Sequence, residues 1–367
     1  MTRTREGTPA ASSGAPGFRV RRGDTGTVLH FEAGRIGAEI RVRVLVVSAL
    51  MVLPIALCTY LALVLGPIHV SAAELWEVLR GDGGKALNKV VLEWRFPRAA
   101  VAILLGAALG LSGAIFQSLT RNPLGSPDIV GFNNGAYVGV IAVTIAGFSG
   151  LVWTSIGAVI GGLATAFVVY ALAFRRGVQG FRFIIVGIAV SAMLASLNTW
   201  FSIVADLDVA MEVAVWGAGS LLGTTWNTVA IAAASIGALV VCLFVAGRWM
   251  PYLELGDDVA KVLGLPVERA KAILIVLGVA LTAVATAVAG PIMFVALAAP
   301  QIARLLCRTG DSVTLLGSAA IGAAIVPAAD LIAQHAFSDS DLPVGAVTVC
   351  IGGIYLVWLL AREARKG

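Results

Sequence analysis

The chain has 367 residues, of which 59% are hydrophobic and only 13% are charged, with a net charge of +5 at pH 7. Soluble domains contain about 45–50% apolar and about 25% charged residues, so this composition excludes an ordinary soluble enzyme and indicates a polytopic membrane protein. Basic residues in such a protein mainly record its topology, so the positive charge is no sign of nucleic-acid binding.

Residues that commonly bind metals are few and lie far apart in the chain. Cys58, Cys242, Cys307 and Cys350 each stand alone in an apolar segment, and the three histidines are equally scattered. A free cysteine in such a segment usually packs as a small apolar residue. We therefore expect no metal site and no cofactor bound by this chain.

Residues 1–40 differ in composition from the rest of the chain, because they are rich in Gly, Ser, Thr and Arg. They lack the apolar core of a signal peptide. This composition predicts a disordered cytoplasmic tail, followed by a transmembrane domain at residues 41–367.

Long apolar runs recur through the rest of the chain. A helix needs about 20 mostly apolar residues to cross a hydrocarbon layer about 30 Å thick. The runs predict an all-α fold with about ten transmembrane helices, at about 43–66, 96–119, 129–148, 150–173, 183–205, 226–247, 272–291, 292–308, 312–336 and 343–361. Only Gly290 and Pro291 separate the seventh run from the eighth, so nine helices are also possible.

The connections between these runs predict the orientation of the helices, because cytoplasmic connections carry an excess of Lys and Arg. With a cytoplasmic N-terminus, the basic connections 174–182, 248–271 and 304–308 and the basic C-terminus all lie in the cytoplasm. The opposite connections are acidic or neutral, apart from residues 67–98. We therefore predict that both termini are cytoplasmic.

The sequence EWRFPRAA, at residues 93–100, breaks this charge pattern, because it places Arg95 and Arg98 at the outer end of the second span. One interpretation is that both side chains extend to lipid phosphates. The other is that they bind an acidic partner outside the membrane.

The sequence QSLTRNPLGSPD, at residues 117–128, ends one span and begins the next. Its two prolines cannot continue a helix, and Asn122 and Asp128 are typical turn and cap formers. The segment is either a tight turn in which Asp128 caps the third span or part of a gate, for which Gln117 and Asn122 are the candidates.

A polar segment, LELGDDVAKVLGLPVERAK, interrupts the apolar pattern at residues 253–271. Gly256 and the two aspartates after it can start a helix, and Gly264 can take the left-handed conformation that ends one. Pro266 then leads into a second short helix. The residues alone fit either an amphipathic loop or a docking element for another protein.

Two polar residues lie inside predicted spans. Asp330 is ionisable and lies near the outer end of the ninth span, so it is either a functional residue or a contact between helices. Asn198 in the fifth span could line a transport pathway or bond a neighbouring helix.

Residues 95–139 read RFPRAAVAILLGAALGLSGAIFQSLTRNPLGSPDIVGFNNGAYVG. Together with three later segments, at 253–271, 289–306 and 342–360, they resemble the FecCD-like permeases of ABC importers for ferric siderophores, haem and cobalamin. The resemblance covers about residues 40–367. SGAIFQSLTRNPLGSPD and the later GGIY are most similar to the ferric enterobactin branch.

The resemblance implies a type II ABC importer permease fold and a docking role for Arg95 and Arg98. In this family, glutamates of an extracytoplasmic binding protein meet permease arginines, and Arg binds carboxylates through a planar fork. A third arginine of the cobalamin importer is replaced here by Gln334, and Gln301 stands where family members generally carry His. Gln does not titrate near neutral pH, which argues against a proton-linked role at that position.

The resemblance also implies that the segment at about 253–270 docks on an ATPase subunit. Ala260 would permit close approach, while Val259 and Leu263 would supply apolar contacts. The full set of expected coupling residues is Gly256, Asp257, Asp258, Ala260, Leu263 and Gly264.

The implied function is import of a ferric siderophore, of the catecholate or enterobactin type, across a bacterial plasma membrane. The expected partners are a second permease subunit, two ATP-binding subunits that use ATP and Mg²⁺, and the binding protein. The chain lacks a Walker motif of its own, so we expect a transporter subunit without an ATPase site. Alternatives are a haem or cobalamin permease of the same type and a stand-alone secondary transporter. An intramembrane enzyme would need a convergent set of catalytic residues within the spans, and none is visible.

Overall fold

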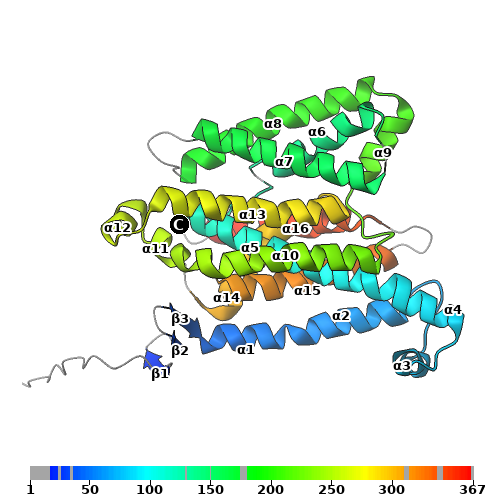
Figure 1. The fold of residues 1–367 in the computed structure, drawn as a ribbon, viewed down its shortest axis with the longest axis horizontal. Helices are drawn as coiled ribbons and strands as arrows, with labels where there is room; N and C mark the ends of the chain where they lie inside the picture. The colour runs from blue at the N-terminus through cyan, green and yellow to red at the C-terminus, as the bar shows by residue number, and fades with distance from the viewer. Residues whose placement is uncertain are drawn as a thin grey trace, which may run out of the picture.

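The computed structural model describes residues 17–23, 26–33, 36–128, 130–148, 150–173, 180–309, 314–336 and 342–364. From residue 42 onward the described chain is helical, and its long helices run side by side along the horizontal direction of Figure 1. This arrangement is the bundle expected of an all-α membrane protein.

The N-terminal residues differ from the expected disordered tail. They form an antiparallel sheet in the order β1-β2-β3, with β1 (Gly17–Gly23), β2 (Gly26–Ala33) and β3 (Ile36–Arg41). The register pairs Gly23 with Gly26 and Ala33 with Ile36, which leaves two residues for each connection. In the sequence, each two-residue connection contains an Asp or a Gly, at positions 24 and 34. The runs on either side mix β-branched or aromatic residues with polar ones, and this pattern favours hairpins. The predicted disorder therefore does not fit residues 17–23, 26–33 and 36–40, which form strands. Residues 1–16, 24–25 and 34–35 lie outside the described part, and the domain boundary stays a prediction.

Among the described residues, ten apolar segments are helical, which agrees with the predicted number of spans. In chain order they are α1 (Val42–Leu50) with α2 (Val52–Val64), α5 (Phe96–Thr120), α6 (Phe132–Ile145), α7 (Leu151–Ala173), α8 (Gly180–Val204), α10 (Trp226–Ala246), α13 (Val267–Ala289), α14 (Val295–Cys307), α15 (Leu315–His335) and α16 (Val344–Ala364). Seven of these segments are long and apolar enough to cross a membrane, and three, in α6, α14 and α16, are shorter. Gly290, with a φ of 70°, ends α13, so the seventh and eighth runs are separate helices.

Several short helices were not predicted. They are α3 (Ala72–Arg80), α4 (Lys85–Asn88), the π-helix η1 (Lys89–Arg95), α9 (Leu207–Gly217), the 3₁₀-helix η2 (Gly247–Trp249) and α11 (Met250–Glu254), whereas the short helix α12 (Asp257–Val262) was predicted. The π-helix precedes Pro97, which has no amide hydrogen to bond the carbonyl four residues earlier. The backbone instead pairs the Phe96 amide with the Val91 carbonyl, five residues back. The second span therefore begins well before residue 96.

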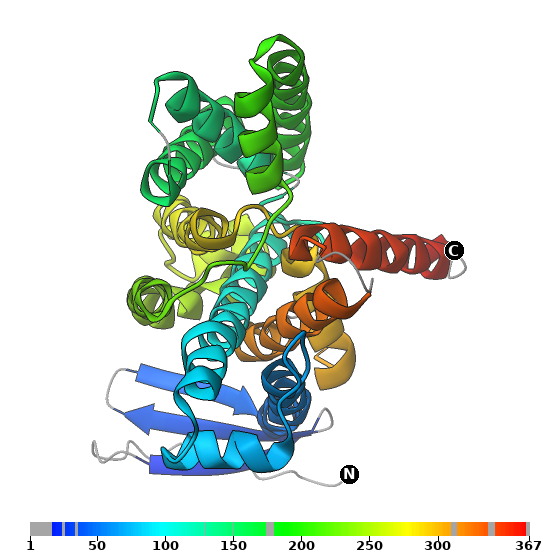
Figure 2. The same cartoon turned by 90° about the vertical axis from the view of Figure 1, so that its right-hand side faces the viewer.

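The centre of the bundle is α5, which packs against α13, α14 and α15. A Cβ atom on Gly106 or Gly110 would collide with the α15 backbone, and one on Gly322 would collide with α5. Small residues thus let the two backbones touch, which supplies the van der Waals packing that helix association in lipid depends on. In Figures 1 and 2, helices α6 to α9 form a separate group beside this centre.

The two ends of the bundle carry different elements (Figure 1). We name the end with α3, α4 and Arg98 the mouth end, and the end with α11, α12 and residues 121–124 the coupling end. The candidate residues from the sequence divide between these ends and the region between them.

Candidate functional site

Arg98 at the mouth end is held by an acidic residue of another helix. Its Nε lies 3.2 and 3.0 Å from Oδ1 and Oδ2 of Asp330, and its Nη2 donates to Oδ1 at 2.8 Å. Gln334 donates to Oδ2 of the same carboxylate at 2.8 Å. The side chains of Arg98 and Asp330 are only 16% and 4% exposed. This fork-to-fork pair joins α5 to α15 in a site largely closed to water.

Arg95 binds backbone carbonyls rather than an acid. Its Nη1 donates to the Leu63 carbonyl at 2.7 Å, and its Nη2 donates to the Ile68 carbonyl. Leu63 belongs to the last turn of α2, whose final carbonyls have no partner within the helix. Arg95 therefore fastens the chain that leaves α2 to the start of the second span.

These contacts give three of the candidate residues a structural role. Asp330 binds Arg98, and Gln334 binds Asp330 in turn. Of the two alternatives for Asp330, the structure therefore shows the contact between helices. A docking role for Arg95 and Arg98 stays a prediction. The pairing could not be read from the sequence, because Arg98 and Asp330 are 232 residues apart.

At the coupling end, Asp257 connects three segments. It accepts a hydrogen bond from Lys271 of α13 and lies 3.5 Å from Arg121, which follows α5. The Lys271 side chain is 3% exposed, so Asp257 supplies the counter-charge for a buried ammonium group. This predicted coupling residue thus holds α12 against the rest of the chain.

The short helix α12 begins and ends as expected. Gly256 has a φ of 111° and Gly264 a φ of 82°, conformations that only glycine adopts easily. The Gly264 amide donates to the Lys261 carbonyl and the Leu265 amide to the Ala260 carbonyl, which closes the helix. The predicted second short helix is wrong, because the residues after Pro266 begin the long helix α13.

The structure contradicts one expectation for α12, that Ala260 would permit close approach of a partner. Ala260 is fully buried within this chain, so its small size serves internal packing and it cannot contact a partner directly. Val259 and Leu263 are exposed as expected, and Asp258 also faces water. Val262, which was not predicted, is 88% exposed. Its spacing of three residues from Val259 was the available signal.

Gln117 is the centre of a buried hydrogen-bond network. Its Oε1 accepts from Gln301 Nε2 at 2.9 Å and from Arg304 Nη2 at 2.8 Å, while its Nε2 donates to the Leu297 carbonyl at 3.0 Å. Gln301 also donates to the Pro123 carbonyl at 2.7 Å. The network ties α14 to the end of α5. Gln301 therefore has a structural role here that the sequence did not show.

The connection between α5 and α6 has its own internal bonds. The Oδ1 atom of Asn122 accepts from the Leu124 amide at 2.9 Å, which is the turn that the sequence predicted. Further on, Asp128 accepts from the Phe294 amide at 3.2 Å and from Asn133 Nδ2 at 2.8 Å. Phe294 has a φ of 66°, rare for a residue with a side chain, and it precedes α14.

Asp128 is therefore placed between the first residues of two short helices, α6 and α14. Burial raises the pKa of its carboxyl group to about 6, and the bonds from the Phe294 amide and from Asn133 oppose that rise. The expectation that Asp128 caps the third span is wrong, because the N-cap of α6 is Gly131 and Asp128 binds the Asn133 side chain instead. The same carboxylate also holds the start of α14. Gating by Gln117 or Asn122 stays a prediction.

Asn198 of α8 bonds the neighbouring helix α6. Its Nδ2 donates to the Asn134 carbonyl at 3.2 Å, and Asn134 in turn donates to the Ser191 hydroxyl at 2.8 Å. Within the described residues the Oδ1 atom of Asn198 is buried without a hydrogen-bond partner. The structure therefore shows Asn198 as a contact between helices, and its role in a transport pathway stays a prediction.

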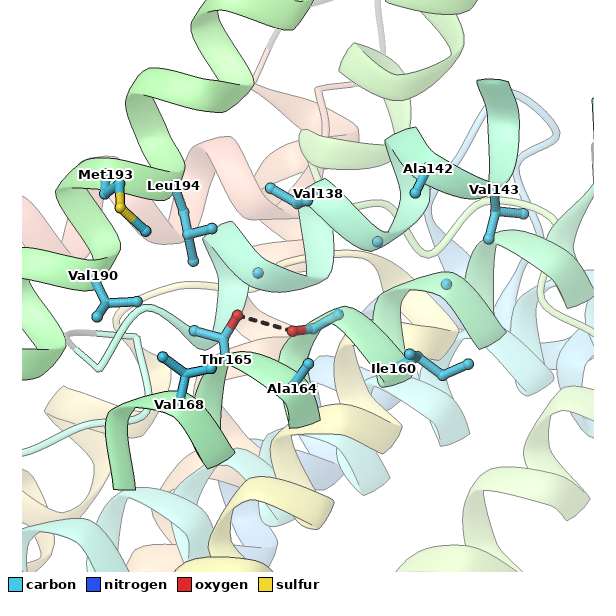
Figure 3. Close-up of a pocket in the computed structure, with 14 residues that line it drawn as sticks. Val138, Ala142, Val143, Ile160, Ala164, Thr165, Val168, Val190, Met193 and Leu194 are labelled. Carbon is cyan, nitrogen blue, oxygen red and sulfur yellow. Dashed lines mark hydrogen bonds between the residues drawn. The ribbon is translucent and has the colours of Figure 1, made fainter. Parts of the chain in front are cut away.

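Beside these residues lies an apolar cavity of about 370 Å³ between α6, α7 and α8 (Figure 3). Its lining includes Gly139 of α6 and Gly157 of α7, together with Met193 and Leu194 of α8. Its one hydroxyl, on Thr165, is bonded to the Gly161 carbonyl of the same helix. The cavity therefore offers nothing to bind a polar ligand. The described residues also contain no cluster of three or more His, Cys, Asp or Glu that could hold a metal ion.

Comparison with known proteins places the chain among transporters. The family model described as the FecCD transport family matches residues 54–362. The ferric enterobactin transport system permease protein FepG of Escherichia coli strain K12 is 46% identical over 301 residues, which are 82% of this chain and 91% of FepG. The iron(3+)-hydroxamate import system permease protein FhuG of Bacillus subtilis strain 168 is 32% identical over 326 residues, covering 87% and 97% of the two chains.

A solved structure shares the fold. It is described as an inward-facing conformation of a metal-chelate type ABC transporter, and it matches with a TM-score of 0.76 and 23% sequence identity. The match covers 86% of this chain and 98% of that one. At this identity the match supports the arrangement of the helices alone.

Proposed function

The chain belongs to the FecCD transport family, and from this premise we propose that it is the permease subunit of an ATP-driven importer for a ferric siderophore of the catecholate, enterobactin-like type. One observation carries the substrate class: the identity with FepG is 46%, against 32% with the hydroxamate permease FhuG. Both values extend over most of the chain, so the difference does not come from one short motif.

The proposed complex contains a second permease subunit, two ATP-binding subunits and an extracytoplasmic binding protein. The exposed residues Val259, Val262 and Leu263 of α12 support docking of an ATPase, because three large apolar side chains on one short polar segment favour burial in a partner. Helices α8 and α10 leave most of their apolar side chains exposed, and a second permease or lipid would cover them.

We propose that ATP and Mg²⁺ are used by the partner subunits and that this chain performs no catalysis. The proposed location is a bacterial plasma membrane, with both termini in the cytoplasm. The distribution of basic residues supports this orientation, since it places the coupling end in the cytoplasm, where ATP is available. The mouth end then faces outward, toward the binding protein.

Uptake of radiolabelled ligands tests the proposal. Host cells with the chain deleted would be compared with complemented cells for uptake of a ferric catecholate, a ferric hydroxamate, haem and cobalamin. Selective loss of the ferric catecholate, restored by the wild-type chain, is the expected result. Loss of haem or cobalamin uptake instead would reject the proposed catecholate substrate, while the chain would still be a permease of this family.

The alternative of a stand-alone secondary transporter requires a separate measurement. Cells depleted of ATP but with an intact proton gradient should not take up the chelate if partner ATPases drive the transport. Continued uptake under those conditions would reject the proposed ATP-driven complex.

A further inference from the structure

Helix α3 at the mouth end has three distinct faces. Leu75 and Val78 are buried against a small core that includes Leu63 of α2 and Val91 of η1. Glu74 and Glu77 form an exposed polar face. Ala72, Trp76 and Leu79, spaced four and three residues apart, form a third face, on which Trp76 is 56% and Leu79 is 53% exposed. Nothing in the described chain covers this second apolar face.

The position of α3 indicates what covers it. Figure 1 shows α3 end-on beside the last turn of α2, while the spanning helices run across the picture. Figure 2, turned by 90°, shows the same helix lying across the edge of the bundle. A helix perpendicular to the spanning helices lies parallel to the membrane plane. Because α3 is at the level where α2 ends, it lies at the boundary between hydrocarbon and headgroups.

The exposed apolar face of α3 continues the lipid-facing surface of α2. Leu53, Leu57 and Tyr60 share one side of α2 and are all exposed, as expected for a span that faces lipid. Ile68, between α2 and α3, is also exposed. Exposed apolar side chains therefore occur on α2, at Ile68 and on α3 at Trp76, with the exposed residues His69 and Ser71 between the last two.

The charged groups near this surface also suit headgroups. The Arg80 guanidinium lies 4.8 Å from the centre of the Trp76 ring, and the Lys89 ammonium lies 5.9 Å from the centre of the Trp94 ring. Tryptophan rings gather at membrane interfaces, where Arg and Lys side chains reach lipid phosphates. Among the described residues no acidic side chain forms a salt bridge with Arg80 or Lys89.

We propose that α3 is an interfacial helix, with Trp76 and Leu79 inserted between the headgroups and acyl chains of the outer leaflet and Arg80 at the phosphates. A lipid surface fits better than an acidic protein, because four acidic residues, Glu74, Glu77, Asp82 and Glu93, accompany the three cations Arg80, Lys85 and Lys89 of residues 67–94. Through the small core that it shares with α2 and η1, the inserted helix fixes the depth of the segment that carries Arg95.

A depth measurement tests this proposal independently of the transported substrate. The full-length chain, with its four native cysteines replaced by alanine, would carry Trp76→Cys or Leu79→Cys labelled with NBD. Glu77→Cys, on the polar face one residue away, is the matched control. Each variant would be placed in phosphatidylcholine–phosphatidylglycerol nanodiscs containing lipid with a doxyl group at carbon 5, and iodide would be added to the water.

Labels at positions 76 and 79 should lose about half of their fluorescence to the doxyl lipid and little to iodide, whereas the label at 77 should show the reverse. Equal quenching of positions 76 and 77 by iodide would overturn the proposal, because the face would then be in water. Protection from both quenchers would indicate a protein contact instead. Protection that arises only when an extracytoplasmic binding protein is added would identify a docking surface and equally reject lipid insertion.

Discussion

The mouth end and the coupling end hold their ionic groups in different ways. At the mouth end, Arg98 and Asp330 form three hydrogen bonds in a pair of which both members are largely buried. At the coupling end, Asp257 is 25% exposed and divides its charge between buried Lys271 and Arg121, which is 43% exposed. A buried pair cannot lose one partner cheaply, whereas a half-exposed contact can exchange with water. The mouth pair is therefore fixed, and the Arg121 contact at the coupling end can rearrange.

Apolar side chains show the same difference between the ends. Val262 and Leu263 are exposed on a polar segment between two spans, where a partner protein is the natural means of removing them from water. Trp76 and Leu79 are exposed on α3, which lies beside the end of α2 (Figure 1). We infer that apolar contact dominates recognition at the coupling end, while Arg95 and Arg98 of the mouth end are engaged within the chain.

The largest effect is expected from Asp330→Ala. It leaves the Arg98 guanidinium buried without a counter-charge, which costs about 3–5 kcal/mol of stability. Thermal unfolding of the detergent-solubilised chain should show a strongly lowered midpoint. Arg80→Ala, which removes an exposed cation at the same end, is the control and should change the midpoint little.

An exchange of the two charges separates packing from docking. Arg98→Asp combined with Asp330→Arg keeps the internal pair but moves the cation to α15. Recovery of most of the lost stability, together with normal uptake, would show that the pair acts internally. Recovered stability with failed binding-protein association would instead support docking through Arg98 itself.

A pH-dependent effect is expected at Asp128. Its pKa in the folded chain is about 6, above the value of 3.8 for an unburied carboxyl group. The folded state therefore holds this proton more tightly, so the contribution to stability is complete below pH 3.8 and is lost as the pH rises through about 6, by about 3 kcal/mol in total. In Asp128→Asn, the unfolding midpoint should lose this part of its pH dependence. An unchanged pH profile in the variant would show that Asp128 is not the group responsible.

A smaller effect is expected on assembly at the coupling end. Val262→Asp with Leu263→Asp places charges on the exposed face of α12, which should weaken binding of the ATP-binding subunits by about 2 kcal/mol, or about thirtyfold. Because both side chains are exposed, the thermal midpoint should hardly change. Pull-down of the ATPase with the tagged permease measures the loss. Lys261→Gln, also exposed on α12 but outside the expected set of coupling residues, is the control and should retain binding.

The sequence predicted the features that depend on local composition. The bilayer requires long apolar runs, so ten spans could be counted, and Gly256 and Gly264 marked the ends of α12 because their backbone conformation requires glycine. It also contained a signal that was missed: Ser71 and Glu74 form a capping box at the start of α3.

Contacts between distant segments could not be predicted in this way. Which residue neutralises Arg98 depends on how α5 and α15 are rotated against each other, and apolar helices give little indication of their rotation. The buried position of Ala260 depends in the same way on how α12 packs. Gly106 and Gly322 illustrate the reason. The two helices touch through their backbones at these glycines, which have no side chain whose pattern could indicate the contact.

The smallest effect is expected at Arg95, where the structure separates two roles of one guanidinium. The side chain bridges the Leu63 and Ile68 carbonyls, and it is only partly buried, so water can replace a lost bond and the cost of removal is about 1 kcal/mol. Arg95→Lys keeps the charge but lacks the planar fork for two carbonyls, and Arg95→Gln keeps a donor but removes the charge. If Arg95 acts as a clamp, both variants should lower the unfolding midpoint by similar small amounts and leave the rate of binding-protein association unchanged. If its charge also guides an acidic partner, association should slow in Arg95→Gln but not in Arg95→Lys, and the difference should disappear at high salt.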